Sequence, residues 1–336
     1  MTTPPLYDPD SLENRDPAAM VALFSRLDPI LERFFKPRVT GLARIPEGPA
    51  LYVANHNAGV LMPDMFILGS AIFHNRPFED MPYGLGHDLA LRPAVLNRLL
   101  CPIGAVRARP GTAERIFERG SKALVFPGGD IEDLRPFSQR DRIVFGNHRG
   151  YVKLALRSGV PISPIVTAGA HSGFVVLDDG GNVARALGLP KWARVNVLPT
   201  ILSFPWGLTF GVPLPYVPLP TRIMTEFLPP IHFAWTGPEA AADEAWVEEC
   251  HERVVSAMQE ALTRLALERR EIRRHEMAAG LDRAFHKMLG VLGLEDDLQQ
   301  ASMTVAPEMH EAPVPLERIE AVEPTIHAPE PVRIAA

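Results

Sequence analysis

Two apolar runs of the chain each end in residues that are able to carry out acid–base chemistry. The run LYVANHNAGVLMPD ends at His56, and Asp64 follows within one short turn. The run LVFPGGDIE places Gly128 and Gly129 at the end of a second strand-like stretch. A neutral imidazole can remove a proton from an alcohol, and a carboxylate on its other nitrogen would fix its tautomer. Backbone N–H groups at a glycine pair would stabilise an oxyanion.

Each of these residues also has a structural explanation. A buried histidine is usually structural, and Pro-Gly-Gly taken alone favours a tight turn after a strand. The nearby Asp130, Glu132 and Arg135 add polar groups without identifying a ligand. The position of His56 at a strand end, before a turn with its own glycine and proline, is what favours a functional interpretation.

Apolar runs and helical periods alternate from about residue 50 onward. Strands are predicted at 50–54, 122–126, 160–166, 195–198 and 223–227. Helices are predicted at 64–73, 111–119 and 150–158. This alternation indicates an α/β fold with a mostly parallel central sheet flanked by helices. Ligands bind such sheets at the carboxyl ends of the strands, where His56 and Gly128 would lie.

The composition and the missing motifs exclude several classes of protein. The 34 prolines among 336 residues exceed average usage. Cys101 and Cys250 cannot form a disulfide framework and fit a reducing cytosol. The first residues, MTTPPLYDPD, lack the regions of a signal peptide, so we expect a cytoplasmic protein. The sequence has no HExxH or CxxC pattern that would indicate a metal site, and no GxSxG or GxxxxGK[ST] motif. It has no excess of basic residues that would indicate nucleic-acid binding.

Two apolar segments each allow two interpretations. Residues 195–221 contain no charged residue, and their six prolines argue against a regular helix or a central strand. This segment would be either a loop packed over the core or an apolar lid that faces lipid or an acyl chain. Residues 17–36 have apolar side chains at helical spacing, interrupted by Pro29, which predicts a helical hairpin or a kinked helix. Packing on the core is favoured there, with membrane docking as the alternative.

Charge is concentrated at the C-terminal end. Residues 276–336 hold eleven acidic and four basic residues, whereas the rest of the chain is nearly neutral. Residues 239–274 predict one long helix with an acidic start and a basic end, an order that suits the helix macrodipole; contact of the basic end with anionic head groups is the alternative. The predicted organisation is an N-terminal helical segment (1–39), a main domain (40–235), a C-terminal helical extension (236–298) and a disordered acidic, Pro-rich tail (299–336).

Four motifs follow one another along the chain. They are NHNAGVLMPD (55–64), IGAVRARPGTA (103–113), LVFPGGDIE (124–132) and RGYVKLALRSGVPISPI (149–165). In this order they resemble the four blocks of the glycerolipid acyltransferase superfamily, which includes the lysophosphatidate and diacylglycerol acyltransferases. The resemblance covers roughly residues 40–235 and implies a single acyltransferase domain.

The resemblance implies roles for individual residues. His56 matches the catalytic base of the family and Asp64 its carboxylate partner. The second block would place Arg107 or Arg109 near the acceptor head group, and the third block would line the acceptor site. The expected substrate-binding residues are Arg107, Arg109, Phe126, Pro127, Gly128, Gly129, Glu132 and Arg135.

The chain departs from the family pattern in two places. The usual first block is HxxxxD, whereas seven residues separate His56 from Asp64 here. The usual third block is FPEG, and Gly128 replaces its glutamate, for which Glu132 is a candidate substitute. The motif HNAGxxxPD with FPGG is more similar to the branch that contains the diacylglycerol acyltransferase-like proteins.

The expected function is that of an O-acyltransferase that moves a fatty acyl group from acyl-CoA or acyl carrier protein to a glycerolipid or related lipid alcohol. The thioester is a co-substrate, and no metal or other cofactor is expected. The acceptor would lie in the membrane, so we expect a peripheral enzyme on its inner face. The alternatives are a non-catalytic lipid-binding protein on the same fold and a thioester hydrolase.

Overall fold

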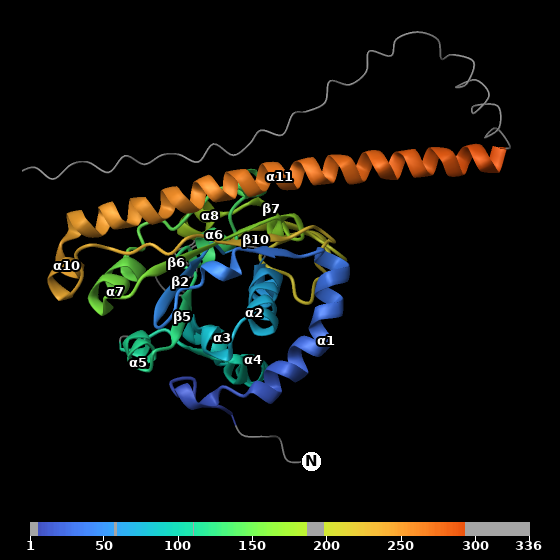
Figure 1. Ribbon diagram of the computed structural model, residues 1–336. Helices are drawn as coiled ribbons and strands as arrows, with labels where there is room; N and C mark the ends of the chain where they lie inside the picture. The colour runs from blue at the N-terminus through green and yellow to red at the C-terminus, as the bar shows by residue number, and fades with distance from the viewer. Residues whose placement is uncertain (1–5, 57–58, 110, 187–197, 293–336) are drawn as a thin grey trace, which may run out of the picture. The chain divides into compact units, whose positions relative to one another are not determined.

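The computed structural model describes residues 6–56, 59–109, 111–186 and 198–292 (Figure 1). The predicted disordered tail, 299–336, and most of the predicted strand at 195–198 lie outside these residues. The chain divides into two units, Met1–His275 and Glu276–Ala336, and the candidate site belongs to the first. The predicted boundaries near residues 40 and 235 fall within that unit and stay predictions.

A seven-stranded sheet positions the candidate site. Its strands are β1 (Arg38–Thr40), β2 (Ala50–Ala54), β3 (Tyr83–Gly86), β4 (Ala105–Arg107), β5 (Lys122–Val125), β6 (Ile162–Ala168) and β10 (Met224–Phe227), in the order β1-β10-β6-β2-β5-β3-β4. The strands from β6 to β4 are parallel, whereas β10 is antiparallel to β6 and parallel to β1. The predicted mostly parallel sheet is confirmed, and the carboxyl ends of β6, β2 and β5 share one edge.

Helices cover both faces of this sheet (Figure 1). They are α1 (Pro17–Phe35), α2 (Pro63–Asn75), α3 (Asp88–Leu91), α4 (Ala94–Leu100), α5 (Thr112–Glu118), α6 (Gly129–Asp133), α7 (Gly150–Ser158), α8 (Gly181–Ala186), α10 (Pro238–Ala242) and α11 (Glu244–Leu292). Leu51 and Val53 of β2 pack into the core shared with α5, α7 and α11, whereas Tyr52 and Ala54 pack with α1 and α2. Because β2 is buried on both sides, it has a continuous apolar sequence.

Helix α1 is one helix rather than a hairpin, and Pro29 lies inside it. Met20, Phe24 and Leu31 are buried against the sheet and α2, which confirms that this stripe packs on the core. None of the described helices is both long and apolar enough to cross a bilayer.

The C-terminal helix begins later than the sequence predicts. The segment expected to be helical from residue 239 divides into α10 and α11 at Asp243. The Asp243 carboxylate accepts a hydrogen bond from the Trp246 N–H (2.8 Å) and caps the first turn of α11. A capping aspartate within an apparently continuous helical pattern therefore marks the boundary.

The uncharged segment 195–221 contains a β-hairpin in place of the predicted loop. Strands β8 (Thr200–Ser203) and β9 (Gly207–Phe210) pair antiparallel, and β7 (Val175–Asp178) pairs with β8 from the other side. The expectation that the prolines exclude a central strand is wrong here, because Pro199 and Pro205 flank β8 and none lies within it.

Candidate active site

The turn after β2 holds His56 at the carboxyl edge of the sheet. The side-chain amide of Asn55 fixes this turn to β6, since it donates to the Thr167 carbonyl (3.0 Å) and accepts from the Thr167 N–H (2.8 Å). His56 is 9% exposed, and its ring packs against Phe126 with the ring centroids 4.7 Å apart. A largely buried imidazole at the edge where parallel strands end suits a general base.

Asp133 is the carboxylate that lies against the His56 ring. Its Oδ1 is 3.6 Å from His56 Nδ1 and accepts a hydrogen bond from the Gly59 N–H (2.9 Å). Asp133 ends α6, which follows β5, and β5 is the parallel neighbour of β2. Burial raises the pKa of Asp133, although His56 and the Gly59 hydrogen bond oppose this. A carboxylate at Nδ1 leaves Nε2 available to take a proton and stabilises the imidazolium that forms.

Asp64 lies in the first turn of α2, close to the predicted start of that helix, and is buried. Its Oδ1 accepts a hydrogen bond from the Met65 N–H (3.0 Å). Burial, together with the charges of Asp133 and Asp64, raises the pKa of Tyr216, so both carboxylates lie near this tyrosine. The pairing of Asp64 with His56 stays a prediction, whereas Asp133 is the carboxylate placed at the ring.

Glu132 and Arg135 lie beneath the site rather than on its surface. Glu132 is fully buried, and its two oxygens accept hydrogen bonds from the N–H groups of His56 (2.8 Å) and Val144 (3.0 Å). Arg135 is 1% exposed and donates to the carbonyl oxygens of His56 (2.8 Å) and Glu132 (2.6 Å). These contacts correct the expectation that the two side chains bind substrate: they hold the backbone of the turn that carries His56.

The buried carboxyl of Glu132 makes folding stability depend on pH. Burial raises its pKa to about 7, although Arg135 and the backbone hydrogen bonds lower it. Because the folded pKa is higher than the unfolded one, this contribution to stability is fully present below about pH 4.5 and is lost as the pH rises through about 7. We expect the unfolding free energy of the wild type, relative to Glu132→Gln, to fall by about 3 kcal/mol across this window.

Urea denaturation of both proteins between pH 4.5 and 8 measures this effect. Glu260→Gln, at an exposed position of α11, is the matched control and should follow the wild type at every pH. A difference between wild type and Glu132→Gln that did not change with pH would contradict the raised pKa.

The turn after β5 leaves one amide of the glycine pair for an oxyanion. The Gly129 N–H donates to the Phe126 carbonyl (3.2 Å), so the Gly128 amide is the candidate from this pair. Gly128 has a steric reason to be glycine, because a Cβ there would lie 2.2 Å from the Cβ of Glu132. Phe126 and Pro127 are partly exposed at this turn, and their contact with a substrate stays a prediction.

Arg107 and Arg109 lie at the same edge of the sheet as His56, but three strand intervals away. At about 4.8 Å per interval, β4 is about 14 Å from β2. Arg107 pairs with Asp88 (2.9 Å) and Asp10 (3.5 Å), and Arg109 also pairs with Asp10 (2.9 Å). The second motif therefore supplies basic groups to this edge, and their contact with an acceptor head group stays a prediction.

His171 is a residue of the site that the sequence analysis did not single out. It follows β6 and is 2% exposed. Burial, followed by the charges of Arg135 and His56, lowers the pKa of His171 well below its ordinary value. Its surroundings therefore disfavour the charged imidazolium form.

Comparisons with known proteins show what this chain is similar to. Residues 36–168 match the Acyltransferase family model. An uncharacterised protein of Mycobacterium tuberculosis is 32% identical over 249 residues, which cover 73% of this chain and 66% of the relative. The mouse DGAT1/2-independent enzyme synthesizing storage lipids is 29% identical over 191 residues, which cover 54% of this chain and 53% of that enzyme. The chain thus spans just under two thirds of the first relative and about half of the second.

Among solved structures, the 1-acyl-sn-glycerophosphate acyltransferase PlsC of Thermotoga maritima aligns with a TM-score of 0.43 and 16% identity, over 75% of this chain and 83% of that chain. The residues matched by the family model include His56, Asp133 and the Pro-Gly-Gly turn that the structure brings together. By this match, residues 36–168 are an acyltransferase domain, and the four motifs and these relatives make the chain similar to the glycerolipid acyltransferase superfamily.

Proposed function

We propose that this protein transfers a fatty acyl group from a thioester, acyl-CoA or acyl carrier protein, to the hydroxyl of a glycerolipid or related lipid alcohol. The observation that carries the proposal is the contact of Asp133 with His56 Nδ1 at the carboxyl edge of the sheet, inside the residues that match the acyltransferase family. The name of the mouse relative, an enzyme synthesizing storage lipids, supports a glycerolipid as the acceptor.

In the proposed reaction, His56 Nε2 takes the proton of the acceptor hydroxyl as its oxygen attacks the thioester carbonyl carbon. The carbonyl becomes an oxyanion, towards which the Gly128 amide would donate. Collapse of this intermediate breaks the carbon–sulfur bond, and the leaving thiolate takes the proton from the imidazolium. Asp133 stabilises the imidazolium while it exists. No acyl-enzyme forms, so a burst of acylated protein on rapid mixing would reject this mechanism.

The acceptor is identified by supplying labelled acyl-CoA with lysophosphatidate, monoacylglycerol, diacylglycerol or a long-chain alcohol. Transfer to one of these would establish the reaction and name the acceptor. Release of free fatty acid with every acceptor would indicate a thioester hydrolase instead. Binding of acyl-CoA without any product would leave acyl carrier protein as the donor to test next, with the lipid-binding alternative after it.

Exposed apolar side chains on the hairpin support docking to a membrane. Phe204 is 62% exposed, Trp206 52% and Phe210 81%, and further apolar side chains follow at Leu208 and Leu214, each 60% exposed. An exposed apolar surface of this kind suits insertion into the interface of a bilayer. We therefore propose a peripheral enzyme on the cytoplasmic face of the membrane, docked through the hairpin.

The chain that leaves the hairpin lies beside the candidate active site, and Val217 in it pairs with Phe204 of the hairpin. Tyr216 accepts a hydrogen bond from the Leu61 N–H (3.2 Å) in the turn that follows His56, and its ring packs on Phe174 with the centroids 4.6 Å apart. Docking through the hairpin would therefore bring the His56 turn close to acceptors in the bilayer.

Replacing Phe204, Trp206 and Phe210 together with serine should weaken sedimentation with phosphatidylcholine vesicles more than tenfold. Burial of a single large apolar side chain contributes about 1.5–3 kcal/mol, and about 1.4 kcal/mol already corresponds to a tenfold change. Val95→Ser on α4, where the side chain is 76% exposed, is the control and should bind as the wild type does. Equal vesicle binding by the triple variant and the wild type would reject docking through the hairpin.

A further inference from the structure

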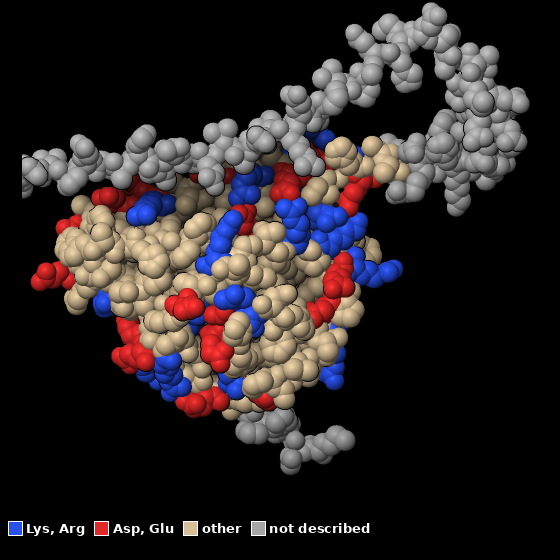
Figure 2. Space-filling model, viewed as in Figure 1, with Lys and Arg blue, Asp and Glu red and all other residues tan. Residues whose placement is uncertain are grey.

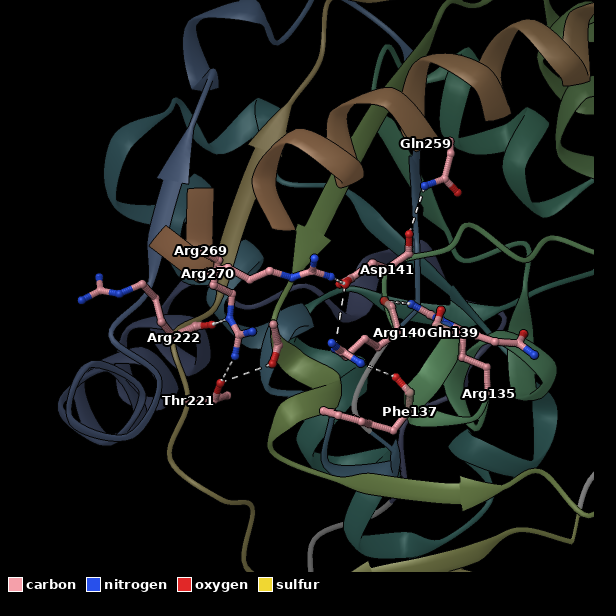
Figure 3. Close-up of polar contacts among 11 residues, drawn as sticks. Arg135, Phe137, Gln139, Arg140, Asp141, Thr221, Arg222, Gln259, Arg269 and Arg270 are labelled. Atoms are coloured by element: carbon pink, nitrogen blue, oxygen red, sulfur yellow. Dashed lines mark hydrogen bonds and ion pairs between the residues drawn. The ribbon is translucent and has the colours of Figure 1, made fainter. Parts of the chain in front are cut away.

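Three arginines gather on the β10 side of the candidate active site. Arg269 and Arg270 project from α11 and Arg140 from the loop beside it, and Figure 3 shows the guanidinium groups of Arg270 and Arg140 directed toward Asp141 and that of Arg269 directed toward Thr221. Asp141 Oδ2 lies 2.6 Å from Arg270 and 3.8 Å from Arg140. The loop is fixed to α11, because the Gln259 side chain donates to the Asp141 carbonyl (3.0 Å). Within this described cluster, the Asp141 carboxylate pairs with two of the three guanidinium groups.

Arg269 is held by neutral oxygens. Its Nε donates to the Arg222 carbonyl (2.7 Å) and its Nη2 to the Thr221 hydroxyl. The Arg222 side chain points away from the cluster in Figure 3. Burial, followed by the charge of Arg273, lowers the pKa of Arg269, and Asp141 opposes this. Because like charges crowd this half-buried guanidinium, an anion bound among the three arginines would lower their mutual repulsion.

The arginines are connected to the turn that carries His56. The Arg140 carbonyl accepts a hydrogen bond from Arg135 Nη2 (3.0 Å), and Arg135 Nη1 donates to the His56 carbonyl (2.8 Å). Arg269 packs on the backbone of Gly169, where an added Cβ would lie 2.5 Å from its Nε. Gly169 follows β6, and β10 is two strand intervals from β2, or about 10 Å across the sheet. An anion held here would lie on the same edge as the candidate catalytic base.

The arginine cluster is continuous with the apolar surface of the hairpin. The chain that leaves the hairpin exposes Leu214 (60%), Val217 (47%) and Leu219 (42%) before it reaches Thr221, which binds Arg269. Figure 2 shows Lys and Arg side chains spread over this face among uncharged residues. Apolar side chains that insert beside basic groups are the combination that binds anionic bilayers.

We propose that Arg140, Arg269 and Arg270 bind the headgroup phosphate of an anionic phospholipid when the hairpin is docked. Guanidinium groups suit this ligand because they can donate two parallel hydrogen bonds to phosphate oxygens. The inference rests on the docking part of the proposed function and adds the class of lipid that is recognised. A soluble phosphate, such as those of coenzyme A, has the same chemistry and is a separate arm of the test.

The test compares sedimentation of the full chain with vesicles of phosphatidylcholine alone and of phosphatidylcholine with phosphatidylglycerol. For the double variant Arg269→Gln/Arg270→Gln, we expect about 25-fold weaker binding to the anionic vesicles, at about fivefold per arginine. Binding to phosphatidylcholine alone should be unchanged. The control is Arg253→Gln, at an exposed position of the same helix, which should retain the preference of the wild type for anionic vesicles. At 1 M salt the preference should disappear, because the Debye length falls to about 3 Å.

If the double variant does not fold, Arg270→Glu provides a second test, since this side chain is half exposed. This variant should bind anionic vesicles more weakly than the wild type and phosphatidylcholine vesicles equally well. Equal losses on both kinds of vesicle, or none on either, would overturn the proposal. Weaker binding of coenzyme A with unchanged binding to anionic vesicles would also overturn it, in favour of a soluble phosphate. If the wild type did not sediment with phosphatidylcholine vesicles, docking through the hairpin would be rejected. Acyl transfer to a detergent-dispersed acceptor tests the catalytic proposal separately.

Discussion

Replacing His56 with alanine should lower acyl transfer by a factor of about 100 to 10,000, the range that a positioned general base contributes. His56 is the proposed base at the sheet edge, and its removal leaves the Gly128 amide and the buried contacts of Glu132 and Arg135 with the backbone of residue 56 in place. Binding of acyl-CoA should therefore be retained. The measurement is turnover of labelled acyl-CoA with the preferred acceptor, beside the dissociation constant for acyl-CoA.

The matched control for this variant is His74→Ala, because His74 is exposed on α2 and pairs with Asp28 (2.8 Å) away from the site. It should keep wild-type turnover. A His56→Ala protein that was folded and retained full turnover would show that this histidine is structural, and the non-catalytic lipid-binding alternative would then be favoured.

Replacing Asp133 with asparagine should lower turnover about 100-fold or more, because the imidazolium loses the charge that stabilises it. Asparagine keeps the shape of the side chain and an oxygen for the Gly59 N–H, so the turn itself should be preserved. Asp64→Asn is the informative comparison, since the family pattern assigns the partner role to Asp64 and the structure places Asp133 at the ring. We expect the larger loss for Asp133→Asn.

The double variant His56→Ala/Asp133→Asn separates a shared role from two independent ones. If Asp133 acts through His56, the double variant should be hardly slower than His56→Ala, because residues that act as a unit are not additive. A larger loss for Asp64→Asn than for Asp133→Asn would assign the partner role to Asp64. Losses that multiplied in the double variant would mean that Asp133 acts independently of His56.

The scaffold could be predicted from the sequence because its signals are local. β2 and β5 are short apolar runs that end in turn residues, and both lie where they were expected. The place of His56 at the end of β2 follows directly, since the carboxyl ends of parallel strands form the ligand edge. The hairpin was missed because β8 is only four residues long, between prolines that dominate the pattern.

The partners within the site could not be predicted in the same way, because they depend on how α6 folds back over the turn after β2. Asp133 stands beside Glu132 in the sequence, yet one contacts the His56 ring and the other its backbone N–H. Nothing in the residue types separates these two carboxylates. Arg269 and Arg270 likewise have the pattern of the ordinary basic end of a helix, and only the packing of α11 on the loop at Arg140 shows that Arg270 meets Asp141 of that loop.

The Glu132 side chain fills the space that a side chain at position 128 would need, which limits how this motif can vary among relatives. A side chain at position 128 would begin 2.2 Å from the Cβ of Glu132 and 2.4 Å from its Oε2. A glutamate at 128, as in the FPEG pattern, and a glutamate at 132 therefore exclude each other in this backbone. Because the two Cβ atoms themselves would collide, the two positions should covary, and a relative with glutamate at one should carry glycine at the other.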